Sequence, residues 1–149
     1  MSERFRSFSA VFPVILRRRE GREEILLLRR ANTGYFDGLW DFAGSGHVDE
    51  GETASQAVCR ECGEELGILV RPEDVSFLHL THWVGETMTY YDLYFQIMAY
   101  EGEPGIREPD KCSELRWFSV EALPEDMIPA RRVDMDLWRN GIFYSETIG

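Results

Sequence analysis

Three glutamates in the middle of the chain have the type and spacing needed to hold a metal ion. Glu61, Glu64 and Glu65 are related as i, i+3 and i+4, so on a helix they lie close together. Glu61 and Glu65 fall within the apolar arc of that helix, and Glu64 lies at its edge. The arc comprises Ala54, Ala57, Val58, Cys62 and Leu66. Crowded, partly buried carboxylates must be protonated, paired with a base or given a cation. Hard oxygen ligands favour Mg²⁺, Mn²⁺ or Ca²⁺, so the cluster predicts a divalent metal site.

The alternative is a solvated acidic helix face, which is the usual role of a run of glutamates. The surrounding residues argue against it. Gly46 is followed at fixed spacing by Glu52, Arg60-Glu61, Cys62, Glu64-Glu65, Gly67 and Ile68. This arrangement resembles the Nudix box, a pattern of Gly, five residues, Glu, seven residues, Arg-Glu, an aliphatic residue, any residue, Glu-Glu, any residue, Gly and an aliphatic residue. Every charged and glycine position matches.

The resemblance extends beyond the box and implies both a fold and a reaction. It includes Asn32-Thr33-Gly34 before the box, and Glu108-Pro109-Asp110-Lys111 and Trp117-Phe118 after it. The implied fold is α+β, a Nudix-type α/β/α sandwich with a mixed β-sheet. The implied reaction is Mg²⁺-dependent hydrolysis of a pyrophosphate linkage, with Mn²⁺ as an alternative ion. Three departures concern packing and loop rigidity: Cys62 replaces a larger aliphatic residue, Gly63 weakens the helix, and the proline common before the box is missing.

The family pattern also assigns roles to individual residues. Glu61, Glu64 and Glu65 resemble the metal carboxylates, and the backbone carbonyl of Gly46 resembles an additional ligand. Glu52 resembles the partner that orients Arg60, and Gly67 closes the helix. Glu108 resembles a distal acid that serves some members as a ligand or base. The catalytic candidates are Glu64, Glu61 and Glu108, and the identity of the general base stays open, with Glu64 and Glu108 as candidates.

Several other residues have both a functional and a structural interpretation. Arg30 and Lys111 could bind substrate phosphates, although both could equally be ordinary surface residues. Cys59 and Cys62 form a C-x-x-C motif, but no second ligand pair stands at zinc spacing, so we set a redox or zinc role aside. His79 and His82 should point to opposite faces of a strand. The aromatic residues Trp83, Tyr90, Tyr91, Tyr94 and Trp117 should be mainly core, with one or two free to stack on a base.

The elements that must position these residues follow from periodicity and turn signals. Strands are expected at residues 8–16, 25–28 and 40–42, with a turn at Glu20-Gly21. The helix at residues 53–66 should begin with a capping box from Thr53 and Gln56. Long paired strands are expected at 75–84 and 88–100, a short strand at 115–118, and a closing helix at 128–138 that ends before Asn140-Gly141.

Composition narrows the class of protein and its partners. A chain of 149 residues, 44% of them hydrophobic, fits a single domain over residues 1–149. The net charge of −11 disfavours a nucleic-acid polymer and leaves small anions possible if a metal intervenes. The resemblance to the Nudix family implies a small nucleotide as the partner. The N-terminal apolar stretch is too short to span a membrane, and three cysteines without a disulfide pattern suggest a cytoplasmic setting. The oligomeric state is open, and a homodimer is compatible with the sequence.

The sequence therefore predicts a pyrophosphohydrolase of small nucleotides. A nucleoside triphosphate, or a modified form of one, is the expected substrate, with a monophosphate and pyrophosphate as products. A nucleotide-sugar or ADP-ribose pyrophosphatase is the alternative among enzymes. A nucleotide-sensing domain without turnover is the alternative among binding proteins, although such domains usually lose the carboxylates that are present here.

Overall fold

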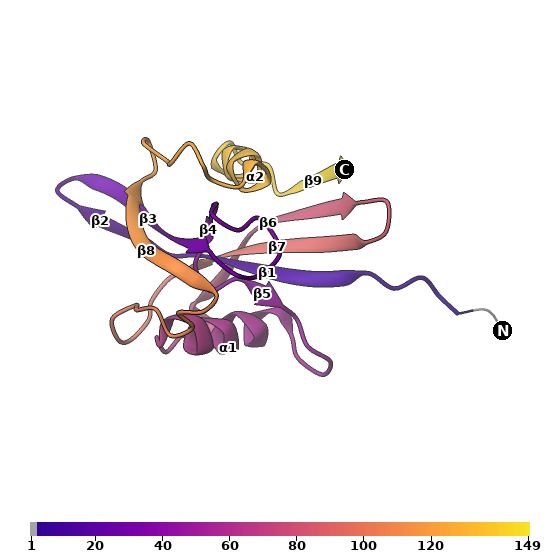
Figure 1. The fold of residues 1–149 in the computed structure, drawn as a ribbon, viewed down its shortest axis with the longest axis horizontal. Coiled ribbons are helices and arrows are strands. Elements are labelled where there is room, and N and C mark those ends of the chain that lie inside the picture. Colours follow the sequence, from indigo (N-terminus) through magenta and orange to yellow (C-terminus); the bar gives the residue numbers. More distant parts are fainter. Residues whose placement is uncertain (1–2) are drawn as a thin grey trace.

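Alternating apolar residues and well-marked turns organise the chain into short strands around two helices (Figure 1). The computed structural model describes residues 3–149. The elements, in chain order, are β1 (Phe8–Val14), β2 (Leu16–Arg19), β3 (Arg22–Arg30), β4 (Trp40–Phe42), β5 (Gly46–His47), α1 (Ala54–Leu66), the 3-10 helix η1 (Pro72–Asp74), β6 (Val75–Val84), β7 (Thr89–Ile97), β8 (Cys112–Ser119), α2 (Pro129–Arg139) and β9 (Tyr144–Ile148).

The strands form two sheets. The first has the order β5-β1-β7-β6-β9, and its β1–β7 and β6–β9 pairs are parallel whereas its other pairs are antiparallel. The second is antiparallel and joins β2, β4 and β8 through β3. The predicted mixed sheet between helices is confirmed, and the structure adds that the mixed pairing belongs to the first sheet alone.

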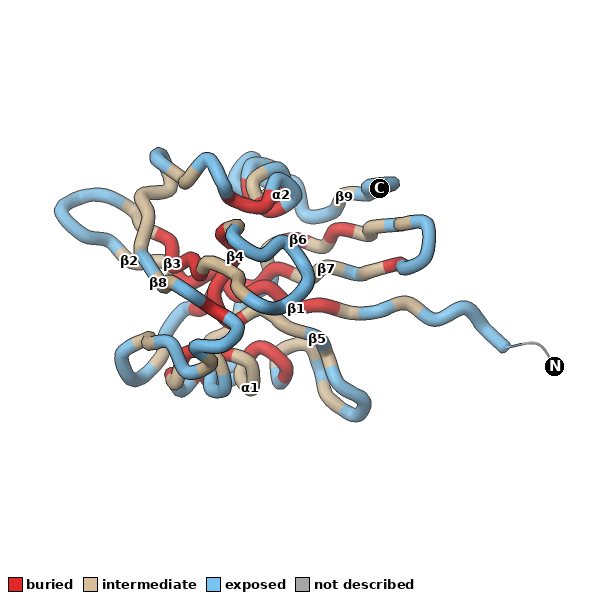
Figure 2. The backbone as a smooth tube through the Cα atoms, viewed as in Figure 1, coloured by how far each residue is buried: buried red, intermediate tan, exposed pale blue. Residues whose placement is uncertain are grey.

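Two apolar cores lie on opposite sides of the strands, and each is covered by one helix (Figures 1 and 2). Because side chains alternate along a strand, Val11 and Phe95 pack in the core that contains the apolar face of α1. Ala10, Phe12 and Tyr94 pack in the second core, which includes residues of α2. Strands β1 and β7 therefore present one face to each helix.

Most of the predicted elements are confirmed, and the differences have physical causes. Helix α1 begins with the predicted capping box and ends at Gly67 in the left-handed conformation. The predicted strand over residues 8–16 is two strands, because the chain passes from the first sheet to the second at Ile15. Strand β8 extends beyond residues 115–118. The predictions missed β5 and β9, which are short or exposed and carry no apolar alternation.

No helix within residues 3–149 has the length and apolar character needed to cross a membrane.

Candidate active site

The loop that leads from β4 into β5 sets the backbone of Gly46, the first residue of β5, against a carboxylate of α1. A Cβ atom added at Gly46 would lie 2.3 Å from Cδ of Glu61, far inside van der Waals contact. Glycine is therefore the only residue that fits here without displacing Glu61. The preceding Gly44 has φ of +84°, a conformation that L side chains rarely adopt, and its N–H donates to Oε1 of Glu65 at 3.0 Å. The loop thus holds two of the three helix glutamates.

Glu61 and Glu65 lie beside the buried face of α1, as the apolar periodicity predicted. Ala57, Val58, Cys62 and Leu66 are buried in the core below them. Burial raises the pKa of Glu65 to about 8, and the hydrogen bond from Gly44 opposes this rise only in part. Burial also raises the pKa of Glu61, against the opposing effect of Arg60. Both carboxylates are thus in an environment that penalises their charge and favours a cation nearby.

Arg60 connects the loop to the helix through a fork of hydrogen bonds. Its Nε and Nη2 atoms donate to the two carboxylate oxygens of Glu52, both at 2.9 Å, and Nη2 also donates to the carbonyl of His47. The Arg60 hydrogen bond lowers the pKa of Glu52 to about 2. Nη1 of Arg60 donates to Glu61 at 2.7 Å and to Glu64 at 3.3 Å. The structure thus places Glu52 where the family pattern expects the residue that orients Arg60.

The remaining predicted acids lie at the edge of the site. The side chain of Glu64 is 57% exposed and turns outward toward Arg60. Glu108 comes from the loop before β8 and forms an ion pair with Lys111, with Oε2 and Nζ 3.6 Å apart. Among residues 3–149, no three acidic, histidine or cysteine side chains converge on one point suited to a metal ion. The oxygen donors are nevertheless of the hard type that suits Mg²⁺, and Glu61 and Glu65 face a common cavity.

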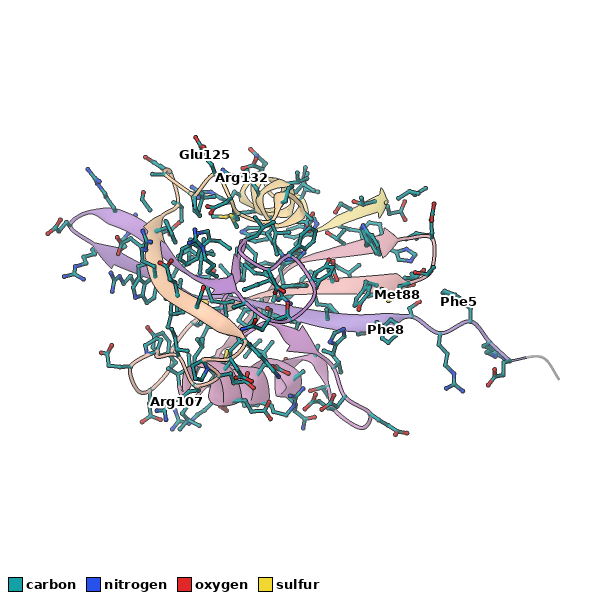
Figure 3. All side chains as sticks on the ribbon, in the orientation of Figure 1. Phe5, Phe8, Met88, Arg107, Glu125 and Arg132 are labelled. Atoms are coloured by element: carbon teal, nitrogen blue, oxygen red, sulfur yellow. The ribbon has the colours of Figure 1, made fainter. Side chains whose placement is uncertain are left out.

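The loop that carries Glu108 is held against the C-terminal end of α1. The N–H of Arg107 donates to the carbonyl of Glu65 at 3.1 Å, and that of Gly105 donates to the carbonyl of Leu66 at 3.0 Å. The Arg107 side chain reaches the end of the helix (Figure 3), where Cβ at Gly67 would be 2.3 Å from its Nε. Glycine at position 67 therefore both ends the helix and allows the loop to approach.

A single cavity of about 800 Å³ joins this acidic site to a second group of polar residues. Glu61, Glu65 and Glu108 line one part of it. Asp92 and Arg131 also line it. Its aromatic and apolar lining residues are Phe12, Tyr35, Trp83, Met88 and Tyr90. The cavity has the mixed lining expected of a site for a small molecule that is charged at one end and flat at the other.

The second polar group is a buried network that the sequence analysis missed. Arg131 of α2 donates from Nε to Asp41 at 3.0 Å and from Nη1 to the Tyr94 hydroxyl at 3.2 Å. Tyr94 in turn donates to Asp134. Each residue is buried. Asp92 stands near this network, and its only sequence signal was a lone charge inside the aromatic strand Tyr-Tyr-Asp-Leu-Tyr-Phe.

The two predicted phosphate-binding residues, Arg30 and Lys111, line the cavity but differ in how many contacts they make with other parts of the protein. Arg30 donates to the carbonyl of Tyr35 at 2.7 Å and to Thr33 at 3.1 Å, and it lies 3.5 Å from Asp41. Its guanidinium is largely committed to holding the loop after β3. Lys111 is exposed, and within the described part of the chain its ammonium has only the long ion pair with Glu108.

The histidines and most aromatic residues behave as the strand pattern predicted. His79 is buried, with Nδ1 2.8 Å from the carbonyl of Ile142, whereas His82 stacks on Tyr91. Tyr94 is core, and Tyr91 is exposed on the other face of β7. Trp83 and Tyr90 line the cavity.

Comparison with known proteins agrees with this geometry. A family profile described as NUDIX domain matches residues 8–138. The chain is 28% identical over 129 residues to a putative 8-oxo-dGTP diphosphatase of Bacillus subtilis, covering 80% of this chain and 73% of that protein. It is 28% identical over 112 residues to the NAD-capped RNA hydrolase NudC of Stutzerimonas stutzeri, covering 74% of this chain and 36% of that protein.

A solved structure of similar fold is the MutT NUDIX hydrolase from Burkholderia pseudomallei. It superposes with a TM-score of 0.75 at 29% sequence identity, over 89% of this chain and 98% of that one. Against the first curated relatives, by contrast, the chain spans only about a third to a half of their length.

Proposed function

The chain belongs to the NUDIX domain family, and from this premise we propose that it is a hydrolase acting on acid anhydrides. The proposed substrate is a small nucleoside diphosphate derivative, in the first place a nucleoside triphosphate or a modified form of one. Cleavage would give the nucleoside monophosphate and pyrophosphate. The names of two relatives, an RNA pyrophosphohydrolase and a putative 8-oxo-dGTP diphosphatase, agree with this class of reaction.

The observation that carries the proposal is the continuity of the cavity. Its acidic part, with Glu61 and Glu65, is suited to a polyphosphate together with a cation. Its other part, with Tyr90 and Trp83, offers flat aromatic surfaces to a base. One small nucleotide would satisfy both parts, whereas inorganic pyrophosphate would leave the aromatic part unused.

The oxygen donors at the acidic end fit a divalent cation. We propose that Glu61, Glu64, Glu65 and the carbonyl of Gly46 would hold Mg²⁺ or Mn²⁺. The ion would supply neutralisation of phosphate oxygens and a more acidic bound water. Arg60, fixed by Glu52, neutralises Glu61 and Glu64 and keeps their carboxylates next to the loop.

The chain's own residues would then handle the proton and the phosphate charge. Water attacks one phosphorus atom of the linkage, a carboxylate takes its proton, and the bridging oxygen leaves with the other phosphate group. Glu64 and Glu108 are the proposed bases, with Glu61 as the third candidate. The proposed role of Lys111, which lines the cavity, is to pair with a phosphate oxygen, and Arg30 would contribute mainly by holding the loop that carries Tyr35.

The partners and setting form part of the same proposal. We take residues 1–149 as one domain that acts on a free nucleotide, with no nucleic-acid polymer or membrane as partner, in the cytoplasm. The charge of −11 supports the absence of a polymer. The free thiols of Cys59, Cys62 and Cys112 suit a reducing compartment.

A substrate panel with identification of products by mass tests this function. It should contain nucleoside triphosphates, oxidised triphosphates, nucleotide sugars, ADP-ribose and a capped RNA oligonucleotide. We expect monophosphate and intact pyrophosphate from a triphosphate, loss of turnover in excess chelator, and recovery with Mg²⁺ or Mn²⁺. Glu61→Gln should lower turnover by roughly a hundredfold, and Glu73→Gln on the exposed surface is the matched control.

Other outcomes of the panel would contradict the proposal in defined ways. Orthophosphate as the first product would indicate a terminal phosphatase. Full activity in chelator would remove the metal from the mechanism. Nucleotide binding without turnover in any arm would identify a sensing domain, and preference for ADP-ribose, a nucleotide sugar or capped RNA would correct the substrate.

A further inference from the structure

Asp92 lies on the floor of the cavity with its carboxylate unused by the protein. It is on β7, in register with Ala10 of β1 on one side and Thr81 of β6 on the other. The Ala10 methyl group is small, and both Ala10 and Asp92 line the cavity. The Asp92 side chain is only 13% exposed, yet it makes no hydrogen bond with any other part of residues 3–149.

The nearby cation does not satisfy Asp92. Nη1 of Arg131 is 3.9 Å from Oδ2 of Asp92, too far for a hydrogen bond. Arg131 is instead committed to Asp41 and Tyr94, and its guanidinium lies 3.7 Å from the centre of the Phe12 ring. Burial raises the pKa of Asp92 to about 6, with Arg131 opposing the rise, so the carboxylate is mostly ionised at pH 7.5. A largely buried, ionised carboxylate with open lone pairs needs donors from a ligand.

The surroundings of Asp92 restrict what that ligand can be. Trp83 and Tyr90 bring aromatic side chains to the same cavity. Met88 also lines the cavity, and the Phe8 ring stacks on Tyr90. A flat heterocycle is a group that packs well against such aromatic side chains. The acidic site for phosphates lies in the same cavity, so one nucleotide could reach both.

We propose that Asp92 is the residue that selects the base, by accepting two hydrogen bonds from adjacent N–H groups of the heterocycle. An ionised carboxylate only accepts hydrogen bonds, so it matches an edge with two neighbouring donors. Among the common bases, guanine has such an edge, formed by its ring N1–H and its exocyclic amino group. Adenine and cytosine have an unprotonated ring nitrogen beside the amino group. This nitrogen is an acceptor, so it would face a carboxylate oxygen of Asp92 with no hydrogen between them.

This inference rests on the proposed function and narrows it to guanine-type nucleotides. The ring N–H and amino donors are the same in guanine and in guanine oxidised at C8, so Asp92 by itself does not separate these two. Asp92 would recognise the base by its hydrogen-bond donors, while the carboxylates of α1 would bind the cation that contacts the phosphates.

The test compares wild type with Asp92→Asn, which keeps the shape and replaces one acceptor by a donor. We expect wild type to prefer dGTP over dATP, dCTP and dTTP. Asp92→Asn should lower kcat/KM for dGTP by about 10- to 100-fold, the range for one bidentate base contact. For dATP it should be unchanged or higher, because a carboxamide pairs with a donor and an acceptor. Asp136→Asn, on the exposed side of α2, is the matched control for charge.

A second variant keeps the carboxylate and closes the space beside it. Ala10→Val adds two methyl groups next to Asp92, so it should weaken turnover of dGTP while leaving the Mg²⁺ requirement intact. Thermal unfolding of each variant shows whether it is folded. If the ratio of dGTP to dATP turnover is the same in wild type and Asp92→Asn, the assignment is wrong even though hydrolysis stands.

Binding of dGMP and dAMP in metal-free buffer, measured by calorimetry, separates this inference from the proposed function. If wild type hydrolyses no nucleotide but binds dGMP more tightly than dAMP, and Asp92→Asn removes that preference, the enzyme proposal fails and the role of Asp92 holds. Equal binding of dGMP and dAMP by wild type, or an unchanged preference in Asp92→Asn, overturns the role of Asp92.

Discussion

Individual carboxylates in this protein differ in how the surrounding structure treats their charge. Glu52 is paired in a fork with Arg60, which lowers its pKa to about 2. Glu65 is buried with one backbone donor, and its pKa is raised to about 8. The first carboxylate is stabilised by the chain alone. The carboxylate of Glu65 is held in an environment that disfavours its charge. This is expected of a group that binds a ligand at the expense of the stability of the fold.

Replacing Glu65 by glutamine tests this difference. The folded pKa of Glu65 lies above its ordinary value of 4.5, so its protonated form is favoured by folding. Its contribution to stability is full below about pH 4.5 and is lost as the pH rises through about 8. In chelator, Glu65→Gln should therefore be at least as stable as wild type near neutral pH, by on the order of 1 kcal/mol, with the gap growing toward pH 8.5.

Adding Mg²⁺ should reverse this ranking, because binding stabilises wild type by RT ln(1 + [L]/Kd) and stabilises the variant much less. Thermal unfolding of both proteins, with and without Mg²⁺, measures the effect. Equal destabilisation of Glu65→Gln in both buffers, together with normal turnover, would mean that Glu65 is an ordinary structural residue.

At the scale of elements, the loop before α1 depends on two glycines for different reasons. Gly44 adopts a positive φ that frees its N–H for Glu65. Gly46 needs no unusual conformation, but it leaves no room for a side chain beside Glu61. The helix start is fixed independently, by the capping box of Thr53 and Gln56. The position of Glu61 is therefore set from both sides, by the helix below and by the loop above.

Gly46→Ala should damage turnover more than stability. Its Cβ would displace the Glu61 carboxylate, and a displacement of about 1 Å at a catalytic site can cost roughly a hundredfold in rate. Gly105→Ala is the matched control, because a Cβ there meets nothing within 4 Å and its φ is not positive. Steady-state kinetics of the two variants decide the matter. Similar losses in both would show that the close contact at Gly46 has no functional role.

The sequence predicted the local elements and the acidic site better than the rest of the cavity. Helix α1 and its caps lie within one continuous segment, so they follow from helix periodicity and capping signals. The Glu52–Arg60 contact was expected from the resemblance to the Nudix box. Asp41, Asp92 and Arg131 come from three distant segments, and only the packing of β4, β7 and α2 brings them together. No periodicity or motif in a single sequence predicts that these three residues lie close together.

At the scale of the whole molecule, the last strand completes a buried polar contact. Ser145 of β9 lies 2.9 Å from Nε2 of His79 and 3.0 Å from Oγ1 of Thr81, both on β6. The carbonyl of Ile142 can only accept, so Nδ1 of His79 donates to it, and Nε2 of His79 is left to pair with the Ser145 hydroxyl. Both β6 residues are buried. Strand β9 thus satisfies groups that would otherwise lack a partner.

Ser145→Ala should lower the free energy of unfolding by about 1 to 3 kcal/mol, because it leaves buried polar groups unsatisfied. Urea denaturation measures this loss. Ser113→Ala, at an exposed position in β8, should stay within about 0.5 kcal/mol of wild type. A neutral Ser145→Ala would show that water replaces the hydroxyl and that β9 contributes little through this contact.

The parallel pairing of β1 with β7 has a consequence for how quickly the protein becomes competent to bind. Helix α1, which carries the acidic residues, forms from neighbouring parts of the chain, and such local structure nucleates fast. The floor under the base cannot form until Ala10 meets Asp92 across most of the chain length, and contacts of such high order are slow to close. During refolding, the acidic end should therefore be present before the end that distinguishes one base from another.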